Sequence, residues 1–330
     1  LMVTAVACNT KIKVNFEAKA SDYVKLGQYK GITVSVDEQA IENELIEKKV
    51  QNDLTSNTTY DEVSREARDK DQVTVDFTGT IGGEEVSGFS NEDYSLILGT
   101  DTFVIDGFID ELYGMSAGQT KVVILTVPED FEDAPEYAGS RIVYNITMKK
   151  VEQPNVPMIT DAYVQEYFSC NTVAEYRQSI KDDIQETIDE QIEDAKKEAV
   201  LTKLQQNCEI TGYPEEYLSS KQSELETSIK FYALMQGLSN DEYCQKSFGI
   251  SFEEYVKRAV AQDLIFQSII EQEDLSITDY EYKGDLESFA DKMGFTNKDS
   301  FVEKYGKDKI VRAMLLQKAQ DVVMNSAVYE

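Results

Sequence analysis

Hydrophobic residues recur at every second position in the middle of the chain, a period typical of β-strands with one buried face. From Gln72 onward, Val73, Val75 and Phe77 alternate with polar residues. The glycine pair at positions 82 and 83 then predicts a hairpin turn, because such turns need residues with positive φ. We predict further strands over residues 94–98, 120–127 and 141–151, with one short helix at about 109–115 among them.

The region before these strands mixes both periods. Residues 27–36 have the β-branched alternation of a strand, and Ser35 to Glu38 form a capping-box pattern at the start of a helix. Ile41, Leu45, Ile46 and Val50 lie at helical spacing after it. A polar run over residues 51–57 follows this helix, and we expect the chain up to Asp71 to be a connector.

Past Pro154 and Pro157 the pattern is helical throughout. Thr172 to Glu175 is a capping-box pattern that opens one long predicted helix with a single buried stripe. That stripe has residues four apart: Tyr176, Ile180, Ile184, Ile188 and Ile192. Further capping boxes are predicted at Ser239, Ser251 and Thr278, and a last helix starts at about Asp308. These elements predict an α+β chain whose second half is all-α and elongated.

Charge and composition exclude several functions. The chain has 330 residues, with 32 Lys plus Arg against 62 Asp plus Glu and a net charge of −30. Nucleic-acid binding is therefore not expected, because a phosphate backbone requires clustered basic residues. The absence of His excludes Ser-His-Asp and Cys-His catalysis. The four Cys, at positions 8, 170, 208 and 244, form no C-x-x-C pair, and no calcium-loop motif occurs. No cofactor or metal is predicted.

The first eight residues read L-M-V-T-A-V-A-C and turn polar at Asn9. The small residues Ala5 and Ala7 before Cys8 resemble a bacterial lipobox, in which the cysteine is acylated. This resemblance predicts a lipid anchor at Cys8 and a location outside the cytoplasmic membrane. The alternative is a short apolar terminus with an incidental thiol, in a cytoplasmic protein.

Residues 73–150 carry an ordered set of motifs. They read V-T-V-D-F-T-G, then G-G-E-E-V, then L-G-T-D-T-F-V-I-D-G-F with M-S-A-G-Q following, then V-P-E-D-F and R-I-V-Y-N-I-T-M-K-K-V. This order resembles an FKBP-type peptidyl-prolyl isomerase domain, a curved antiparallel sheet wrapped on a short helix. Prolyl isomerisation is compatible with a chain that lacks His, because it requires neither a nucleophile nor a metal.

The flanking segments resemble trigger factor, over roughly residues 28–330. The resemblance rests on Y-K-G-I-T-V with its acidic helix upstream, and on the helix from Thr172 and the Y-P-E-E-Y restart downstream. It implies an FKBP-like domain followed by a helical chaperone domain that acts on unfolded polypeptides. Nothing in the sequence matches the G-F-R-x-G-x-x-P ribosome-docking loop of that family, so no ribosome docking is expected, and exported proteins with X-Pro bonds are the expected clients. The predicted division is 1–27 signal remnant and tether, 28–71 linker, 72–152 isomerase domain and 153–330 helical domain.

The FKBP resemblance also implies the residues of the isomerase pocket. Phe108 would be its floor, and the Ile105 backbone N–H would donate a hydrogen bond to a substrate carbonyl. The predicted site residues are Phe77, Val86, Val104, Ile105, Phe108, Phe131 and Tyr144. Ser87 stands where the family usually has an acidic residue. The ordered motif favours the pocket for Ile105, Phe108 and Tyr144, whereas Phe77 and Val104 fit a plain hydrophobic core equally well.

Three functions stay open from the sequence. The first is a membrane-anchored prolyl isomerase and holding chaperone. The second is a catalytically inactive peptide-binding chaperone that uses the helical domain, and the third is a cytoplasmic trigger factor shortened by truncation. Several aromatic and Met side chains of the helical domain fit either client-binding clefts or ordinary interhelical core. They are Tyr213, Tyr217, Phe231, Tyr232, Met235, Phe248, Phe252, Tyr255, Phe266 and Tyr280.

Overall fold

The computed structural model describes residues 10–131 and 133–330, and it separates into two compact units. One unit consists of residues 42–185 and contains the main β-sheet. The other consists of residues 186–330 together with the described part of residues 1–41, and it is mostly helical. The predicted α+β class, an FKBP-like sheet followed by a helical domain, is confirmed. The predicted anchor at Cys8 lies outside the described residues.

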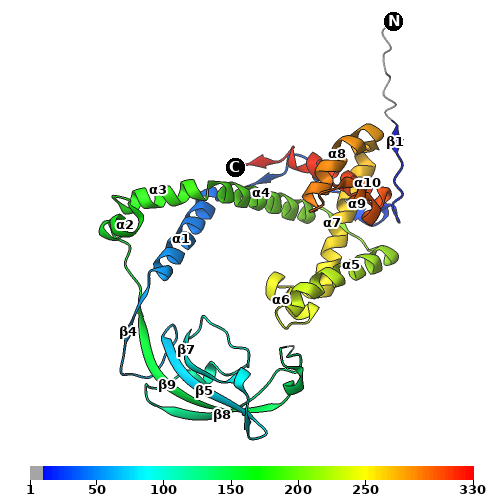
Figure 1. Ribbon diagram of the computed structural model, residues 1–330. Coiled ribbons are helices and arrows are strands. Elements are labelled where there is room, and N and C mark those ends of the chain that lie inside the picture. The colour runs from blue at the N-terminus through cyan, green and yellow to red at the C-terminus, as the bar shows by residue number, and fades with distance from the viewer. Residues whose placement is uncertain (1–9, 132) are drawn as a thin grey trace. The chain divides into compact units, whose positions relative to one another are not determined.

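The six-stranded antiparallel sheet is built around one long strand, β9 (Arg141–Asn155). This strand pairs along one side with β5 (Gln72–Ile81), and on the other side with β8 (Thr120–Thr126) and then β4 (Thr59–Glu62). β5 also pairs with β6 (Glu84–Glu85) through the predicted hairpin, and with β7 (Asn91–Ile97). Figure 1 shows the sheet curled around the loop that follows β7.

The sheet encloses the core of the first unit. Along β5 every second side chain is buried, including Val73, Val75 and Phe77, as the period of two predicted. The predicted short helix is only a 3₁₀ turn, Asp110–Leu112. Gly107 and Gly114 lie on either side of it with φ of 81° and 77°, and this left-handed backbone ends a right-handed helix. The predicted connector before Asp71 contributes β4 to the sheet.

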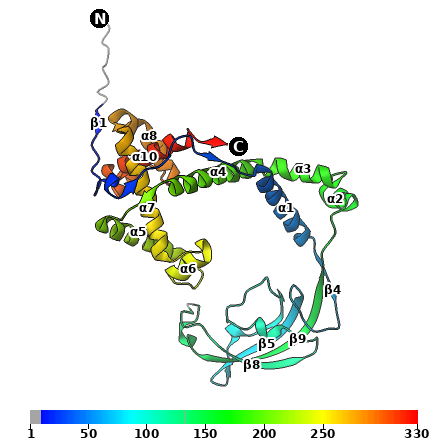
Figure 2. The same ribbon diagram turned by 180° about the vertical axis from the view of Figure 1, so that it is seen from behind.

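The second unit is a group of helices around its own hydrophobic core. Helix α7 runs from α6 to the group formed by α8, α9 and α10 (Figures 1 and 2). Capping boxes open α6 and α8 at Ser239 and Thr278, as predicted. The bounds of the helices are α4 Gln185–Asn207, α5 Glu215–Leu234, α6 Asn240–Phe248, α7 Phe252–Glu273, α8 Asp279–Lys292, α9 Lys298–Tyr305 and α10 Lys307–Met324.

The N-terminal segment is built into this helical unit. Three two-residue strands pair with distant parts of the chain: β1 (Lys11–Ile12) with β11 (Ile277–Thr278), β2 (Val24–Lys25) with β10 (Glu209–Ile210), and β3 (Thr33–Val34) with β12 (Val328–Tyr329). Ala20, Val24 and Ile32 are buried in the helical core. The division therefore differs from the predicted tether and linker, because buried apolar residues attach this segment to the helices. The strand predicted over residues 27–36 is reduced to β3.

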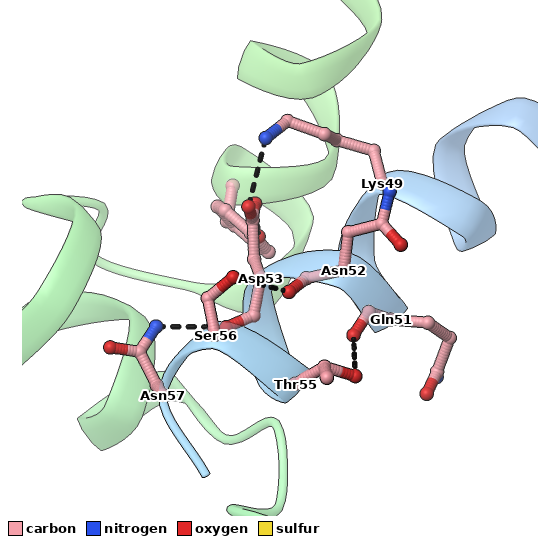
Figure 3. Close-up of polar contacts among 8 residues, drawn as sticks. Lys49, Gln51, Asn52, Asp53, Thr55, Ser56 and Asn57 are labelled. Carbon is pink, nitrogen blue, oxygen red and sulfur yellow. Dashed lines mark hydrogen bonds and ion pairs between the residues drawn. The ribbon is translucent and has the colours of Figure 1, made fainter. Parts of the chain in front are cut away.

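Helix α1 (Glu38–Ser56) continues through the polar run that was expected to follow it. Figure 3 shows where its polar side chains bond near the helix end: Thr55 Oγ1 donates to the Gln51 carbonyl at 2.8 Å and Ser56 Oγ to the Asn52 carbonyl at 2.9 Å. Each polar side chain thus bonds to the carbonyl one turn earlier, within the helix. At the start of α1 it is Asp37 that accepts the Ala40 N–H, and not the predicted capping box at Ser35.

The long helix predicted from Thr172 is two helices. α3 (Val173–Asp183) ends before Ile184, and α4 starts at Gln185, where the two units also divide. Tyr176 and Ile180 of α3 pack with α1 and α2 (Asp161–Phe168) in a small core of the first unit. Farther along, Val200 and Leu204 of α4 belong to the helical core. The first three residues of the predicted stripe, Tyr176, Ile180 and Ile184, therefore face the small core, whereas other residues of α4 contact the helical core.

Candidate functional site

Five aromatic rings gather in the core of the sheet domain. Phe108 lies 5.0 Å from Phe77 and 5.0 Å from Tyr144, measured between ring centroids, and each pair meets edge to face. Tyr94 closes the group at 5.6 Å from Phe77. The fifth ring, Phe103, lies among the other four. We call Phe77, Tyr94, Phe108 and Tyr144 the aromatic cage.

Different elements of the domain bring the cage residues together. Phe77 lies on the buried face of β5, Tyr94 on β7 and Tyr144 on β9. Phe108 comes from the loop after β7, and both Phe108 and Tyr144 are fully buried. Because adjacent strands place their buried faces on one side of a curled sheet, rings far apart in sequence converge on the loop that the sheet surrounds.

The remaining predicted site residues lie in three settings. Ile105 is buried in the same core as the cage. Val104 is 57% exposed, and Val86 is half-buried against this core. Phe131 instead packs on Phe89, with centroids 5.5 Å apart, in a second aromatic group that also includes Tyr137. The structure thus brings Phe77, Ile105, Phe108 and Tyr144 together.

One cage residue, Tyr94, and the ring inside the cage, Phe103, were not predicted. Phe103 directly precedes the V-I-D-G-F stretch that starts at Val104, and Tyr94 opens a predicted strand. The signal that could have identified Tyr94 is its register opposite Val75 on β5, two positions from Phe77. Phe103 lies in a loop, so no periodic pattern fixes the direction of its side chain.

The site offers two hydrogen-bond donors. Among the described residues, the Ile105 N–H finds no acceptor, while its carbonyl accepts the Phe108 N–H at 3.2 Å. The Tyr144 hydroxyl is enclosed and has no partner in the described part of the chain. Burial raises the pKa of Tyr144 well above its ordinary value, so the hydroxyl keeps its proton. Both groups are donors of the kind that stabilises the carbonyl oxygen of a bound substrate in a site without water.

Ser87 lies outside the cage. It is exposed and starts a 3₁₀ turn, Ser87–Phe89, and it borders a polar hollow of about 460 Å³ that also includes Asp76, Thr78 and Asn145. Asp76 and Thr78 alternate along β5 with the buried side chains, so this hollow is mainly on the other face of the sheet.

The helical unit carries a second candidate surface at the end of α5 and on α6. Four neighbouring side chains there are strongly exposed although they are apolar or aromatic: Phe231 at 63%, Tyr232 at 54%, Leu234 at 66% and Met235 at 73%. Phe248 of α6 adds to them at 46%. We call these five residues the apolar tip. Of the other aromatic residues considered from the sequence, Tyr217 and Phe266 are buried, whereas Tyr280 is exposed.

Within residues 10–131 and 133–330, no group of three or more Cys, Asp and Glu side chains is arranged to hold a metal ion. No helix in that same part of the chain is both long enough and apolar enough to cross a membrane.

A curled antiparallel sheet around an aromatic cage, followed by a helical unit with an exposed apolar tip, defines the class by its fold: an FKBP-like domain followed by a helical domain. Comparison with known families agrees with this fold. Residues 63–149 match the FKBP-type peptidyl-prolyl cis-trans isomerase model, and residues 172–325 match the C-terminus of the bacterial trigger factor protein.

Relatives cover nearly the whole chain. The trigger factor of Caldicellulosiruptor bescii is 29% identical over 95% of this chain and 74% of its own length. That of Caldicellulosiruptor saccharolyticus is 28% identical with the same coverage, and that of Lachnoclostridium phytofermentans is 27% identical over 94% of this chain and 74% of its own. A solved structure of the trigger factor chaperone aligns with 92% of this chain and 72% of its own at 19% identity, with a TM-score of 0.44. The chain is a trigger factor-like protein with an FKBP-type isomerase domain, shorter than the relatives that it matches.

Proposed function

We propose that this chain catalyses cis-trans isomerisation of X-Pro bonds in unfolded polypeptides and holds such polypeptides on its helical unit. The observation that carries the catalytic part is the aromatic cage of Phe77, Tyr94, Phe108 and Tyr144, in a domain that matches the FKBP family. Binding of unfolded polypeptides is the known activity of the trigger factor family and fits the apolar tip.

Catalysis of this kind works through the environment of the bond. Rotation about an X-Pro bond faces a barrier of roughly 18–20 kcal/mol, because the planar amide is stabilised by resonance. A dry aromatic cage receives the proline ring and removes water from the amide, which favours the twisted, less polar state. In this proposal the Ile105 N–H, which finds no acceptor among the described residues, donates to a carbonyl of the substrate. No titratable catalytic group is required.

The test compares the wild type with Phe108→Ala in two assays. One is isomerisation of a short X-Pro peptide, and the other is refolding of a protein limited by a trans-to-cis prolyl step. We expect a loss of about 10- to 100-fold in kcat/KM, as a transition-state contact of about 1.4–2.7 kcal/mol disappears. Unchanged rates in a folded Phe108→Ala variant contradict the proposal.

A matched control separates catalysis from stability. Met115 is buried in the same core and takes part in none of the ring contacts of the cage. Met115→Ala removes a comparable amount of buried surface, so it should lower the melting temperature like Phe108→Ala and leave the isomerase rate of the folded protein intact.

Suppression of aggregation by a wild type without any isomerase activity would identify the inactive, peptide-binding alternative.

We further propose that the clients are exported proteins and that the chain is anchored by lipid at Cys8. The support is the sequence Ala5-Val-Ala-Cys8, which resembles a lipobox. The test is metabolic labelling with a fatty acid in the source cells, for the natural gene and its Cys8→Ala variant. Label that disappears with Cys8, together with loss of the protein from the membrane fraction, supports the anchor. An unlabelled wild type in the soluble fraction favours a cytoplasmic chaperone, and co-sedimentation with ribosomes would do the same.

A further inference from the structure

The ring of Phe103 occupies the centre of the aromatic cage. Its centroid lies 3.9 Å from that of Phe108, with the two planes 18° apart, so the rings are stacked face to face. It also lies 5.5 Å from Phe77, 5.9 Å from Tyr94 and 6.3 Å from Tyr144, all at steep angles. One side chain thus contacts every wall of the cage and covers its floor.

This arrangement conflicts with substrate binding, since Phe108 is fully buried with the Phe103 ring lying over it. A proline ring that is to pack on Phe108 needs the volume that Phe103 fills, because protein interiors are close-packed and two rings cannot share one space. Phe103 itself is only partly buried. Its ring therefore takes the place of a ligand inside the cage.

The loop around Phe103 leaves room for the ring to move. Phe103 also lines a hollow of about 370 Å³, which is bordered by Thr100, Ile105 and Ile109. The neighbouring residues Thr102 and Val104 are exposed. A rotation of the Phe103 side chain out of the cage therefore meets open space and does not require the sheet to open.

We propose that Phe103 is a plug that closes the isomerase site, and that substrate proline binds by displacing it. This inference rests on the proposed function of the cage. The measured association constant for prolyl peptides is then the intrinsic constant multiplied by the fraction of molecules in which the Phe103 ring lies outside the cage. The plug selects segments that bring an apolar residue beside the proline, because such a residue can cover the displaced ring.

The test measures two quantities on the full chain: binding of a short X-Pro peptide by calorimetry, and its rate of isomerisation. Removal of the plug by Phe103→Ala should tighten binding and raise kcat/KM by about tenfold, the factor expected if the cage is open in about a tenth of the molecules. Phe103→Met, which keeps side-chain volume but replaces the rigid ring by a flexible chain, should give an intermediate gain and covers the case in which the alanine variant does not fold. Thr102→Ala, on the same loop but outside the cage, is the matched control and should match the wild type.

The outcomes separate this inference from the proposed function. Equal or weaker peptide binding by both folded Phe103 variants overturns the plug, and then Phe103 is an ordinary wall of the pocket. Tighter binding without any isomerisation, in the wild type and in all variants, supports the plug and contradicts the catalytic function. Binding by neither the wild type nor the variants overturns both.

Discussion

Asp71 is buried at the start of β5 and is held there by Arg65, whose Nη1 and Nη2 donate to its two carboxylate oxygens at 2.5 and 2.9 Å. The Arg68 backbone N–H adds a third bond at 2.9 Å. The pair fixes the loop that leads into the strand carrying Phe77. A charged group as deeply buried as Asp71 is stable only with such partners.

Removal of Arg65 should therefore destabilise the isomerase domain. Arg65→Met leaves the Asp71 carboxylate buried without its charged partner, and we expect a loss of about 3 kcal/mol in the free energy of unfolding, measured with urea. The matched control is Arg177→Met. It breaks the Arg177–Glu47 pair, whose side chains are 40% and 47% exposed, and should cost less than about 1 kcal/mol. Equal losses in the two variants would show that burial of Asp71 does not decide the effect.

The same pair predicts how stability depends on pH. Burial alone raises the pKa of Asp71, but the hydrogen bonds from Arg65 and from the Arg68 N–H outweigh it, so the pKa is lower than usual. A lowered folded-state pKa stabilises the protein above the unfolded value of about 3.9, and this contribution disappears as the pH falls through the folded value. The difference in unfolding free energy between the wild type and Asp71→Asn should thus be constant from about pH 5 to 7 and shrink below about pH 4. If the difference in unfolding free energy between the two proteins grows as the pH falls, the pKa of Asp71 is not lowered in the folded protein.

The Tyr144 hydroxyl supplies a third prediction. It is enclosed without a partner among the described residues, and such a group costs about 1–3 kcal/mol when it is buried. Tyr144→Phe keeps the ring contacts with Phe77 and Phe108 and removes the isolated hydroxyl, so the melting temperature should rise or stay unchanged. If this hydroxyl donates to the substrate, kcat/KM of peptide isomerisation falls in the same variant. A lower melting temperature would show that the hydroxyl has a partner in the folded protein.

The apolar tip should be needed for holding clients but not for folding. Leu234→Ser combined with Met235→Ser changes two side chains that are 66% and 73% exposed, so stability should change by less than about 0.5 kcal/mol per site. Light scattering after dilution of a denatured, aggregation-prone protein should show weaker suppression of aggregation, with peptide isomerisation unaffected. Lys230→Ser, a change at an exposed polar position of the same helix, is the control. Unchanged suppression would place client binding elsewhere.

A substitution at Gly27 tests whether the N-terminal segment packs as part of the helical unit. A Cβ at this position would lie 1.9 Å from the Asn207 carbonyl oxygen, which belongs to the backbone at the end of α4. Gly27→Ala should therefore separate β2 from β10 and lower the unfolding free energy of this unit by about 2 kcal/mol or more. Gly284→Ala is the opposite control: it lies in α8 with open space around it, and alanine should stabilise that helix by up to about 1 kcal/mol. An unchanged unfolding free energy in Gly27→Ala would mean that the N-terminal segment does not pack tightly against α4.

Local patterns predicted much of the isomerase domain and the helix starts. The alternation around Phe77 specified which face of β5 is buried, and the capping boxes at Ser239 and Thr278 form as expected. These features depend on hydrogen bonds and burial within a few residues, so the sequence encodes them directly. The ordered FKBP motif predicted that Phe108 and Tyr144 lie together. The residues of this motif share one core, and the two rings are in contact there.

What the sequence by itself determined about this protein is therefore its class, most of its long strands, and the helix caps at Ser239 and Thr278. Tertiary structure alone decided that Phe103 lies inside the cage, that the helix predicted from Thr172 is interrupted at Ile184, and that residues 11–34 attach to the helices. These depend on contacts between residues far apart in the chain. A two-residue strand or a loop side chain has no period of its own, and only the packing of its distant partners sets where it lies.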